Sequence, residues 1–296
     1  MALTDAKSTF TEAFFEGIGN ADGEWAVANA LCNVRYDDTP ILKRAGMVVT
    51  GLGDVPAWSP TTSDPTAKAI NSPYQTSVNY AEYAVLIKAT KLETADHGQT
   101  MIQEAGRALG YSTAYTLSGL GTTKAVVGTF TENGADGKGV FANDHPRGDG
   151  SSVQDNLLAS GLDRAGLQVA LKTLATWLAY SGHKVDATSG GLVLAVPPAE
   201  LVNATEMVRS ELSGSGNQVN VLKDFDIQIV STNRFTSDTK WALFNKRMLP
   251  TSLWIRSAPE FDLFTDQYTH QTVIRVSFAA AAYYEPLVEG CVGSAP

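Results

Sequence analysis

Residues 90 to 118 read TKLETADHGQTMIQEAGRALGYSTAYTLS, the longest stretch of the chain with the pattern of a single helix. The stretch contains no proline, and its apolar and small residues recur at spacings of three and four. A helix of this length would span roughly 42 Å, which is long for a globular domain. The pattern therefore predicts a long helix around which the other segments are organised, and we call it the spine helix.

Three glycines interrupt the predicted spine helix, namely Gly98, Gly106 and Gly110. Each glycine in a helix costs about 1 kcal/mol of stability relative to alanine. A helix that keeps them usually has other backbone packed closely against the same face. We therefore expect a neighbouring segment to lie against this side of the spine helix.

The composition is that of a globular protein with a sizeable core, since 44% of its 296 residues are hydrophobic. No run approaches the roughly 18 apolar residues of a membrane span, and the N-terminus lacks a signal-peptide pattern, so we expect no membrane association. Cys32 and Cys291 stand far apart without metal-site spacing, which predicts two buried, reduced thiols in a cytoplasm. The net charge of −9, without clustered Lys and Arg, argues against a protein that grips nucleic acid through its phosphates.

The sequence predicts an amphipathic helical arm near the N-terminus, before the spine helix. Residues 4 to 18 read TDAKSTFTEAFFEGI, and Phe10, Phe14 and Ile18 fall on one helical face. An arm of this kind packs on its own subunit or on a neighbour, and the sequence leaves both possibilities open.

Residues 36 to 79 change character, with repeated glycine and proline between short β-prone pieces. The following segment, NYAEYAVLIKAT at residues 79 to 90, has the pattern of a strand that leads into the spine helix. The whole region is interpreted as a two-stranded excursion that leaves the domain and returns, or else as a loop without fixed structure. A loop of this length is usually functional or supported by another molecule, which favours an inter-subunit arm.

After the spine helix, residues 120 to 130 (LGTTKAVVGTF) predict a short strand, and residues 131 to 152 predict a turn-rich loop. The loop contains residues that suggest two kinds of site. Asp144, His145 and Ser151 suggest a hydrolase triad, but no nucleophile elbow or oxyanion motif accompanies them. Asp136, Asp144 and Asp149 suggest a calcium loop, but their spacing does not fit the EF-hand pattern.

No other chemistry-bearing motif is present. His97, His183 and His270 are isolated, and neither a phosphate loop nor a zinc pattern occurs. We therefore predict no catalytic, cofactor-binding or metal-binding residues, no cofactor, and a protein that is not an enzyme.

The second half alternates helices and strands. Asp163 is predicted to cap a helix at residues 164 to 180, in which Trp177 packs into a core. The apolar run GLVLAVPP at residues 191 to 198 predicts a buried strand, and the double proline begins a second helix, AELVNATEMVRSEL. Later strand patterns continue to the end of the chain. The fold class is thus α+β, with a mostly antiparallel sheet in this half.

In the order of these blocks the chain resembles the major capsid proteins of tailed bacteriophages, specifically the Mu-like prophage major head subunit family. The resemblance covers nearly the full chain. It is carried by the N-terminal arm, NYAEYAVLIKAT with the long helix, DGKGVFANDHP followed by Asn156, GLVLAVPPAELVNATEMV, WALFNK and IRSAPEFDLFTD.

The resemblance implies the Hong Kong 97 capsid fold, with an N-terminal arm, an extended β loop, a peripheral domain with a long spine helix, and an axial domain. The implied boundaries are an arm at 1–35, an extended loop at 36–88, a peripheral domain at 89–160, an axial domain at 161–250, and return strands with the C-terminal segment at 251–296. The last strands are expected to rejoin the peripheral sheet.

The resemblance also implies a virion protein, assembled in the bacterial host cytoplasm, whose copies form hexamers, pentamers and an icosahedral shell around double-stranded DNA that is bound without sequence specificity. Scaffold, portal and decoration proteins are further implied partners. The candidate inter-subunit contacts are Phe10, Phe14, Val55, Trp58, Lys68, Ile70 and Tyr74. Some relatives of this fold cross-link through a lysine of the extended loop, but a solvated Lys68 is the favoured interpretation. Alternatives are an encapsulin-like compartment, a tail-tube or decoration protein, and, least favoured, a hydrolase using His145.

Overall fold

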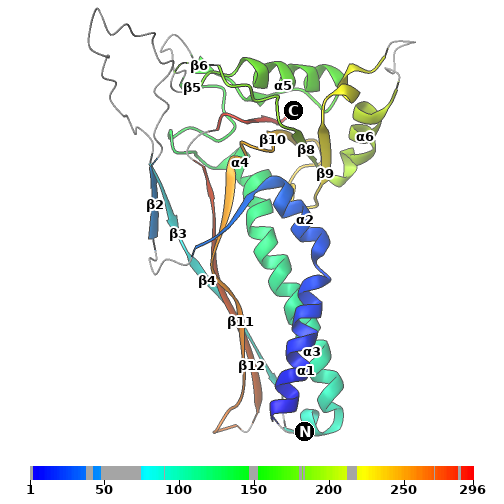
Figure 1. Ribbon diagram of the computed structural model, residues 1–296, viewed down its shortest axis with the longest axis vertical. Helices are drawn as coiled ribbons and strands as arrows, with labels where there is room; N and C mark the ends of the chain where they lie inside the picture. The colour runs from blue at the N-terminus through cyan, green and yellow to red at the C-terminus, as the bar shows by residue number, and fades with distance from the viewer. Residues whose placement is uncertain are drawn as a thin grey trace, which may run out of the picture.

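The structure is a computed structural model that describes residues 3–37, 43–47, 75–89, 91–146, 153–179, 182, 184–211, 219–269, 271–285 and 288–296. Figure 1 shows a narrow lower part, in which long helices lie beside long strands, and a broader upper part built from shorter elements. This mixture of helices and sheets confirms the predicted α+β class.

The spine helix α3 (Lys91–Thr123) is longer than predicted. It continues without a break through a π-helical turn, Lys124–Gly128, into α4 (Thr129–Thr131). The prediction of a strand at residues 120 to 130 is therefore wrong.

Packing explains why this valine- and threonine-rich segment is helical. Ala125 and Val126 are buried in the core of the upper part, on the face that the helix turns toward it. The hydroxyl of Thr129 donates to the carbonyl of Ala125 (2.7 Å), a local bond that helices offer to threonine. Tertiary burial thus overrides the β propensity of a short apolar run.

The N-terminal arm forms two helices, α1 (Leu3–Gly19) and α2 (Asp22–Leu31), which confirms the predicted helical arm. In Figure 1, α1 lies along the lower half of α3 and α2 continues upward beside it. Phe10 and Phe14 are fully buried in a cluster with residues of α3 and of the adjoining sheet. The arm therefore packs on its own subunit.

Glycines of the spine helix set the closeness of this packing. A Cβ atom added at Gly110 would lie 2.0 Å from the carbonyl oxygen of Phe14, and one at Gly106 would lie 2.9 Å from the Cβ of Ala13. The expectation of closely packed backbone is confirmed at these two positions. It is wrong for Gly98, where an added Cβ would meet nothing within 4 Å.

A four-stranded sheet lies beside the spine helix, with the strand order β1-β11-β12-β4. Its members are β1 (Asn33–Tyr36), β11 (Thr251–Thr265), β12 (Thr272–Tyr284) and β4 (Ala81–Ala89). β1 runs parallel to β11 and the other pairs are antiparallel, with register shifts in β11 between Ile255 and Glu260. Ile274 and Val276 of β12 pack against the arm and the spine helix.

Strands β2 (Lys43–Met47) and β3 (Gln75–Asn79) pair antiparallel as a separate two-stranded sheet. They lie between β1 and β4 in the sequence, so the predicted two-stranded excursion is confirmed for these residues. The segment that joins β2 to β3 lies outside the described residues.

The upper part contains a five-stranded sheet with the order β7-β13-β10-β8-β9. Its members are β7 (Leu157–Leu158), β13 (Cys291–Ser294), β10 (Trp241–Asn245), β8 (Leu192–Val196) and β9 (Ile227–Ser231). The two outer pairings of this sheet are parallel and the two inner ones antiparallel. Among the strands of the second half, β10–β13, β10–β8 and β11–β12 pair antiparallel, as the sequence predicts, and β8–β9 is the parallel exception. β11 and β12 join the four-stranded sheet as expected, whereas β13 lies inside the five-stranded one.

Helices α5 (Arg164–Thr176) and α6 (Leu201–Arg209) pack against this sheet. The Asp163 carboxylate caps α5 by accepting from the Gly166 N–H (2.6 Å), and Trp177 is buried, as the sequence predicts. The 3-10 turn Pro198–Glu200 leads into α6, and another, Val221–Asp224, precedes β9. Two short strands, β5 (His145–Pro146) and β6 (Val153–Gln154), pair at the edge of this part.

The largest hydrophobic cluster joins the two parts, because it includes Leu31, Cys32 and Val126 together with the strands of the five-stranded sheet. Cys32 and Cys291 are free and buried, as the sequence predicts for the two side chains. Within the described residues, no helix combines the length and the apolar character needed to cross a membrane. The side chains of His97, His183 and His270 lie outside the described set.

Candidate functional site

The sequence-predicted contact residues separate into two groups. Phe10 and Phe14 are fully buried, and their rings lie 5.0 and 5.5 Å from that of Phe261 on β11. In this conformation they belong to the core of the subunit. The remaining candidates lie outside the described residues: Val55, Trp58, Lys68, Ile70 and Tyr74.

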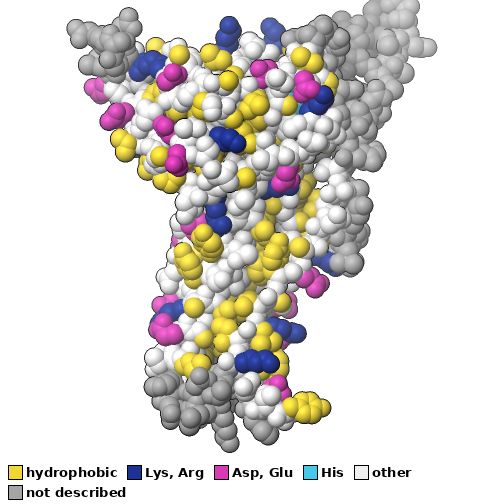
Figure 2. All heavy atoms as spheres, turned by 180° about the vertical axis from the view of Figure 1, so that it is seen from behind, with side chains coloured by type: hydrophobic (Ala, Val, Ile, Leu, Met, Phe, Trp, Pro, Cys, Tyr) yellow, Lys and Arg dark blue, Asp and Glu magenta, His cyan; other side chains and the backbone are white. Residues whose placement is uncertain are grey.

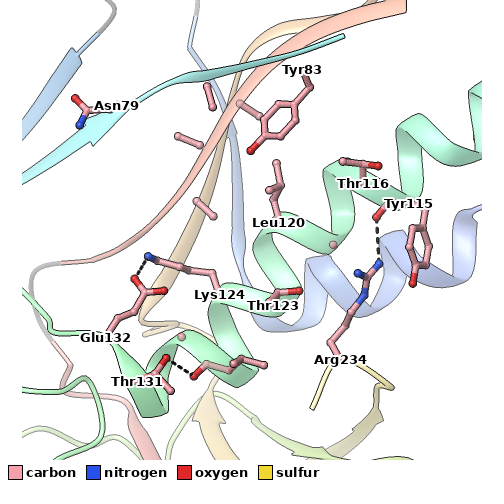
Figure 3. Close-up of a pocket in the computed structure, with 17 residues that line it drawn as sticks. Asn79, Tyr83, Tyr115, Thr116, Leu120, Thr123, Lys124, Thr131, Glu132 and Arg234 are labelled. Atoms are coloured by element: carbon pink, nitrogen blue, oxygen red, sulfur yellow. Dashed lines mark hydrogen bonds and ion pairs between the residues drawn. The ribbon is translucent and has the colours of Figure 1, made fainter. Parts of the chain in front are cut away.

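A groove of about 540 Å³ lies between the upper end of the spine helix and the four-stranded sheet (Figure 3). Small residues form much of its lining, with Gly119, Thr123 and Gly128 on the helical side and Ala280, Ala281 and Ala282 on β12. The two glycines are needed for close approach by the chain's own side chains, because a Cβ at Gly119 would lie 2.7 Å from the Arg234 guanidinium and one at Gly128 would lie 2.1 Å from the Tyr284 hydroxyl.

Charged groups mark the two ends of this groove. Lys124 and Glu132 form an ion pair across the π-helical turn, as the dashed line in Figure 3 shows, and the Lys124 ammonium lies 4.5 Å from the ring centroid of Tyr284. At the other end the Arg234 guanidinium stacks 4.0 Å over the ring of Tyr115 and donates to the Tyr115 carbonyl (3.3 Å). The buried Nε of Arg234 has no acceptor among the described residues.

A second hollow of about 340 Å³ adjoins the groove and shares Asn79, Lys124 and Glu132 with it. It lies between β3, the loop after α4, and the end of β12. The two hollows together follow the upper end of β12 from the spine helix toward the excursion.

The end of β12 offers an open strand edge along these hollows. β4 pairs with β12 only as far as Ala81 opposite Ala280, whereas β12 continues to Tyr284. On the side away from β11, no described strand pairs with residues 281 to 284. Open N–H and C=O groups of this kind can pair with an added strand, so the arrangement suits the binding of an extended polypeptide.

The loop that carries His145 is built as a structural unit. His145 is 1% exposed, with Nδ1 2.7 Å from an Asp136 carboxylate oxygen and Nε2 3.2 Å from the Val140 carbonyl. Its ring lies edge-on to Trp177, and Asp144 pairs with Lys138 instead. Both ring nitrogens therefore face acceptors inside the protein, and the ring has no surface at which to meet a substrate. Ser151 and Asp149 lie outside the described residues.

Asn156 extends this loop unit into the five-stranded sheet. It is fully buried, donates through Nδ2 to the Val140 carbonyl (2.9 Å) and accepts through Oδ1 from the Ala142 N–H (2.8 Å). Its own carbonyl accepts from Gly293 of β13 (2.8 Å). The histidine-proline block and the following asparagine are thus one hydrogen-bonded structure. Among the described residues, no group of His, Cys, Asp and Glu is placed to hold a metal ion.

The sequence patterns did not identify the apolar residues that the structure leaves exposed at the surface. Val202, Val219 and Val221 are 68, 74 and 61% exposed, on or beside α6 and the turn before β9. Figure 2 shows hydrophobic side chains interspersed with charged ones over both parts of one face. The exposure of Val202 depends on which face of α6 the sheet covers, whereas Val219 and Val221 lie before and at a short 3-10 turn, where no helical period applies. The contact of Arg234 with Tyr115 on the spine helix also has no local sequence signal, because only the folded chain brings the two residues together.

The sequence matches no protein-family model and no curated protein. Solved structures do match it. The capsid of cyanophage P-SCSP1u is 13% identical with a TM-score of 0.57, over 89% of this chain and 86% of that one. The mature capsid of bacteriophage PhiM1 is 9% identical with a TM-score of 0.56, over 90% and 86%.

A virus-like particle from Pyrococcus furiosus is 11% identical with a TM-score of 0.54, over 97% of this chain and 98% of that one. At these identities the similarity concerns the fold, and it extends over nearly the whole length of each chain. The arm, the excursion, the spine helix and the two sheets therefore make up the Hong Kong 97-type capsid fold that the order of sequence blocks predicts.

Proposed function

We propose that this chain is a major capsid protein, whose copies assemble into the icosahedral head that encloses the double-stranded DNA genome of a tailed bacteriophage. The observation that supports this best is the extent of the fold match, because capsid subunits of two phages align with about nine-tenths of the chain. The four-stranded sheet with the spine helix would be the peripheral domain, and the five-stranded sheet the axial domain. The narrower assignment to Mu-like head subunits rests on the sequence blocks alone.

Self-association is a function that requires no catalytic site. Each contact in a closed shell is modest, but it is repeated around rings of five and six subunits, so the summed effect is large. A non-enzymatic role also agrees with the position of His145, whose ring is enclosed by the protein. Scaffold, portal and decoration proteins remain proposed partners, and the virion, assembled in the host cytoplasm, the proposed location.

The acidic balance of the subunit fits a container for DNA. The chain carries 31 Asp and Glu against 22 Lys and Arg. A lumen that bound phosphates tightly would hinder both packaging and release of the genome. We therefore propose that packaged DNA is enclosed without sequence-specific binding.

Negative-stain electron microscopy with light scattering tests the proposal on the protein expressed alone. Closed shells, or rings of five and six subunits, are the expected result. A matched variant, in which residues 50 to 75 are replaced by a short Gly-Ser linker, should stay folded but lose these assemblies. If the parent remains a monomer even when co-expressed with its neighbouring phage genes, the capsid function is wrong.

The variant His145→Ala separates the structural role from the hydrolase alternative. It should be less stable, because Asp136 loses its buried partner, yet it should still assemble in the cold. The purified parent should show no hydrolytic activity that the variant lacks. An activity lost in His145→Ala alone would support the hydrolase.

An encapsulin-like compartment is a second candidate, favoured by the near-complete alignment with the virus-like particle. The two candidates differ in content. Particles isolated from their native source contain genome-length DNA if the chain is a phage head protein. Particles that contain a folded enzyme and no such DNA would favour the compartment.

A further inference from the structure

The two ends of the excursion start from opposite edges of the four-stranded sheet. The chain leaves at Asp37, directly after the edge strand β1, and returns at Tyr80, directly before the other edge strand, β4. Two strands, β11 and β12, lie between these edges. The side chains of Asp37 and Tyr80 nevertheless meet, because the Tyr80 hydroxyl donates a hydrogen bond to the Asp37 carboxylate.

This contact is built into its surroundings. Asp37 is 3% exposed, and its N–H donates to the Ile255 carbonyl (2.9 Å), which extends the β1–β11 pairing by one residue. The next residue, Arg256, has no partner in the β11–β12 register and lies in the irregularity between Ile255 and Ser257. A bulge of this kind redirects a side chain, and here the Arg256 guanidinium lies 5.9 Å from the ring centroid of Tyr80.

The contact lies directly beside the base of β2 and β3. The first pair of that two-stranded sheet, Lys43 with Asn79, is one residue away from Tyr80. A hydrogen bond to a buried carboxylate is strong and directional, and a carboxylate that loses such a partner is costly to keep buried. Both ends of the excursion are therefore held at one place above the sheet.

We propose that the Asp37–Tyr80 hydrogen bond is a latch that fixes the angle at which the paired strands β2 and β3 leave the body of the subunit. The latch acts within one chain and does not depend on shell assembly. In its absence β2 and β3 stay paired, but they turn as a unit about the two strand ends.

Electron-spin distance measurement on the unassembled subunit tests this latch. Spin labels at Ser77→Cys on β3 and Ala108→Cys on the spine helix occupy exposed positions, whereas the native cysteines are buried. Labelled protein is mixed with excess unlabelled protein, so that only distances within one subunit contribute. The parent should give one narrow distribution.

The variant Tyr80→Phe removes only the hydroxyl. We expect the population at other distances to rise about ten-fold or more, which is the usual consequence of losing a hydrogen bond to a charged group. Asp37→Ala should act in the same direction, and the double variant should add nothing to the larger single effect. Tyr36→Phe makes the same chemical change at a neighbouring tyrosine that is 69% exposed, and it should leave the distribution unchanged.

Hydrogen exchange in the spine helix and β10 confirms that each variant keeps its fold. If Asp37→Ala does not fold, the distance distribution of Tyr80→Phe alone tests the latch. A Tyr80→Phe protein with the parent's distribution, or additive effects of the two changes, would overturn the latch. Neither result bears on whether the chain forms a shell, so the two proposals fail separately.

Discussion

Gly110 determines how closely the N-terminal arm approaches the spine helix. An alanine Cβ there would lie 2.0 Å from the Phe14 carbonyl oxygen, which is backbone and cannot turn away. We expect Gly110→Ala to lower the free energy of unfolding by about 2–4 kcal/mol, because α1 must shift away from the spine helix. Denaturant unfolding followed by circular dichroism measures the change.

The matched control is Gly98→Ala in the same helix, where the added Cβ meets nothing within 4 Å. Alanine is the better helix former, so this variant should gain up to about 1 kcal/mol. Equal effects at the two positions would show that helix propensity, not contact with the arm, decides the cost.

The two thiols make stability depend on alkaline pH. Burial raises the pKa of Cys32 to about 12, and burial also raises the pKa of Cys291. In the unfolded chain a thiol loses its proton above about pH 8.5, whereas the folded chain keeps both protons. The stabilising contribution is therefore complete below that pH and is lost progressively as the pH rises toward 12.

The free energy of unfolding should accordingly fall between about pH 9 and pH 11, measured in urea at each pH. A variant with Cys32→Ala and Cys291→Ala should show a shallower fall. The remaining slope is expected from Tyr283 and Tyr284, since burial raises the pKa of both phenols. A variant as steep as the parent would contradict the role assigned to the thiols.

Among the elements, β13 is short, but the five-stranded sheet depends on it. Its four residues lie between β7 and β10, inside the five-stranded sheet, and all four are buried. A chain that stops after Glu289 should lose the folded upper part, while the lower part stays protected. Limited proteolysis with mass spectrometry should then release fragments of residues 160 to 250.

A chain that stops after Ser294 is the control for this truncation. It keeps the pairing with β10 and loses only the last two residues, one of which donates from Ala295 to the Leu158 carbonyl (3.0 Å). It should resist proteolysis almost as well as the full chain. Resistance of the shorter chain would show that β7 and β10 close the sheet without β13.

Elements whose apolar residues recur with a clear helical or strand pattern could be predicted from the sequence, and the other elements could not. The arm, the spine helix, β8 and the capped helix α5 each show an apolar pattern that matches their structure. The sequence of residues 120 to 130 predicts a strand, because valine and threonine favour strands, and only packing against the upper core makes the segment helical. β13 is too short to show a period, so its place in the sheet depends on its partners.

For the molecule as a whole, the order of the blocks predicted the fold, but no single segment predicted the groove. The groove brings together Tyr83, Lys124, Arg234 and Ala281 from distant parts of the chain. Of the seven predicted contact residues, Phe10 and Phe14 are in the core, and the other five lie outside the described residues. Surfaces formed by such long-range contacts carry no local sequence signal.

Net charge leads to a prediction for assembly. Each subunit carries a net charge of −9, so copies repel one another as they gather. Raising sodium chloride from about 50 to 500 mM shortens the screening length several-fold and should lower the protein concentration at which shells form. Light scattering across a concentration series measures this threshold. A threshold that rises with salt would indicate contacts dominated by ion pairs between subunits.

The central position of β13 also has a consequence for the timing of synthesis. Domains fold while the ribosome is still adding residues, at about 5–20 residues per second. The spine helix and the arm leave the ribosome early, but the five-stranded sheet stays incomplete until residues 291 to 294 emerge. A nascent chain therefore lacks a finished upper surface until those residues emerge. Truncated mRNA and stalled ribosomes would yield chains that lack β13 and therefore lack that surface. Such incomplete chains would be excluded from any assembly that depends on it.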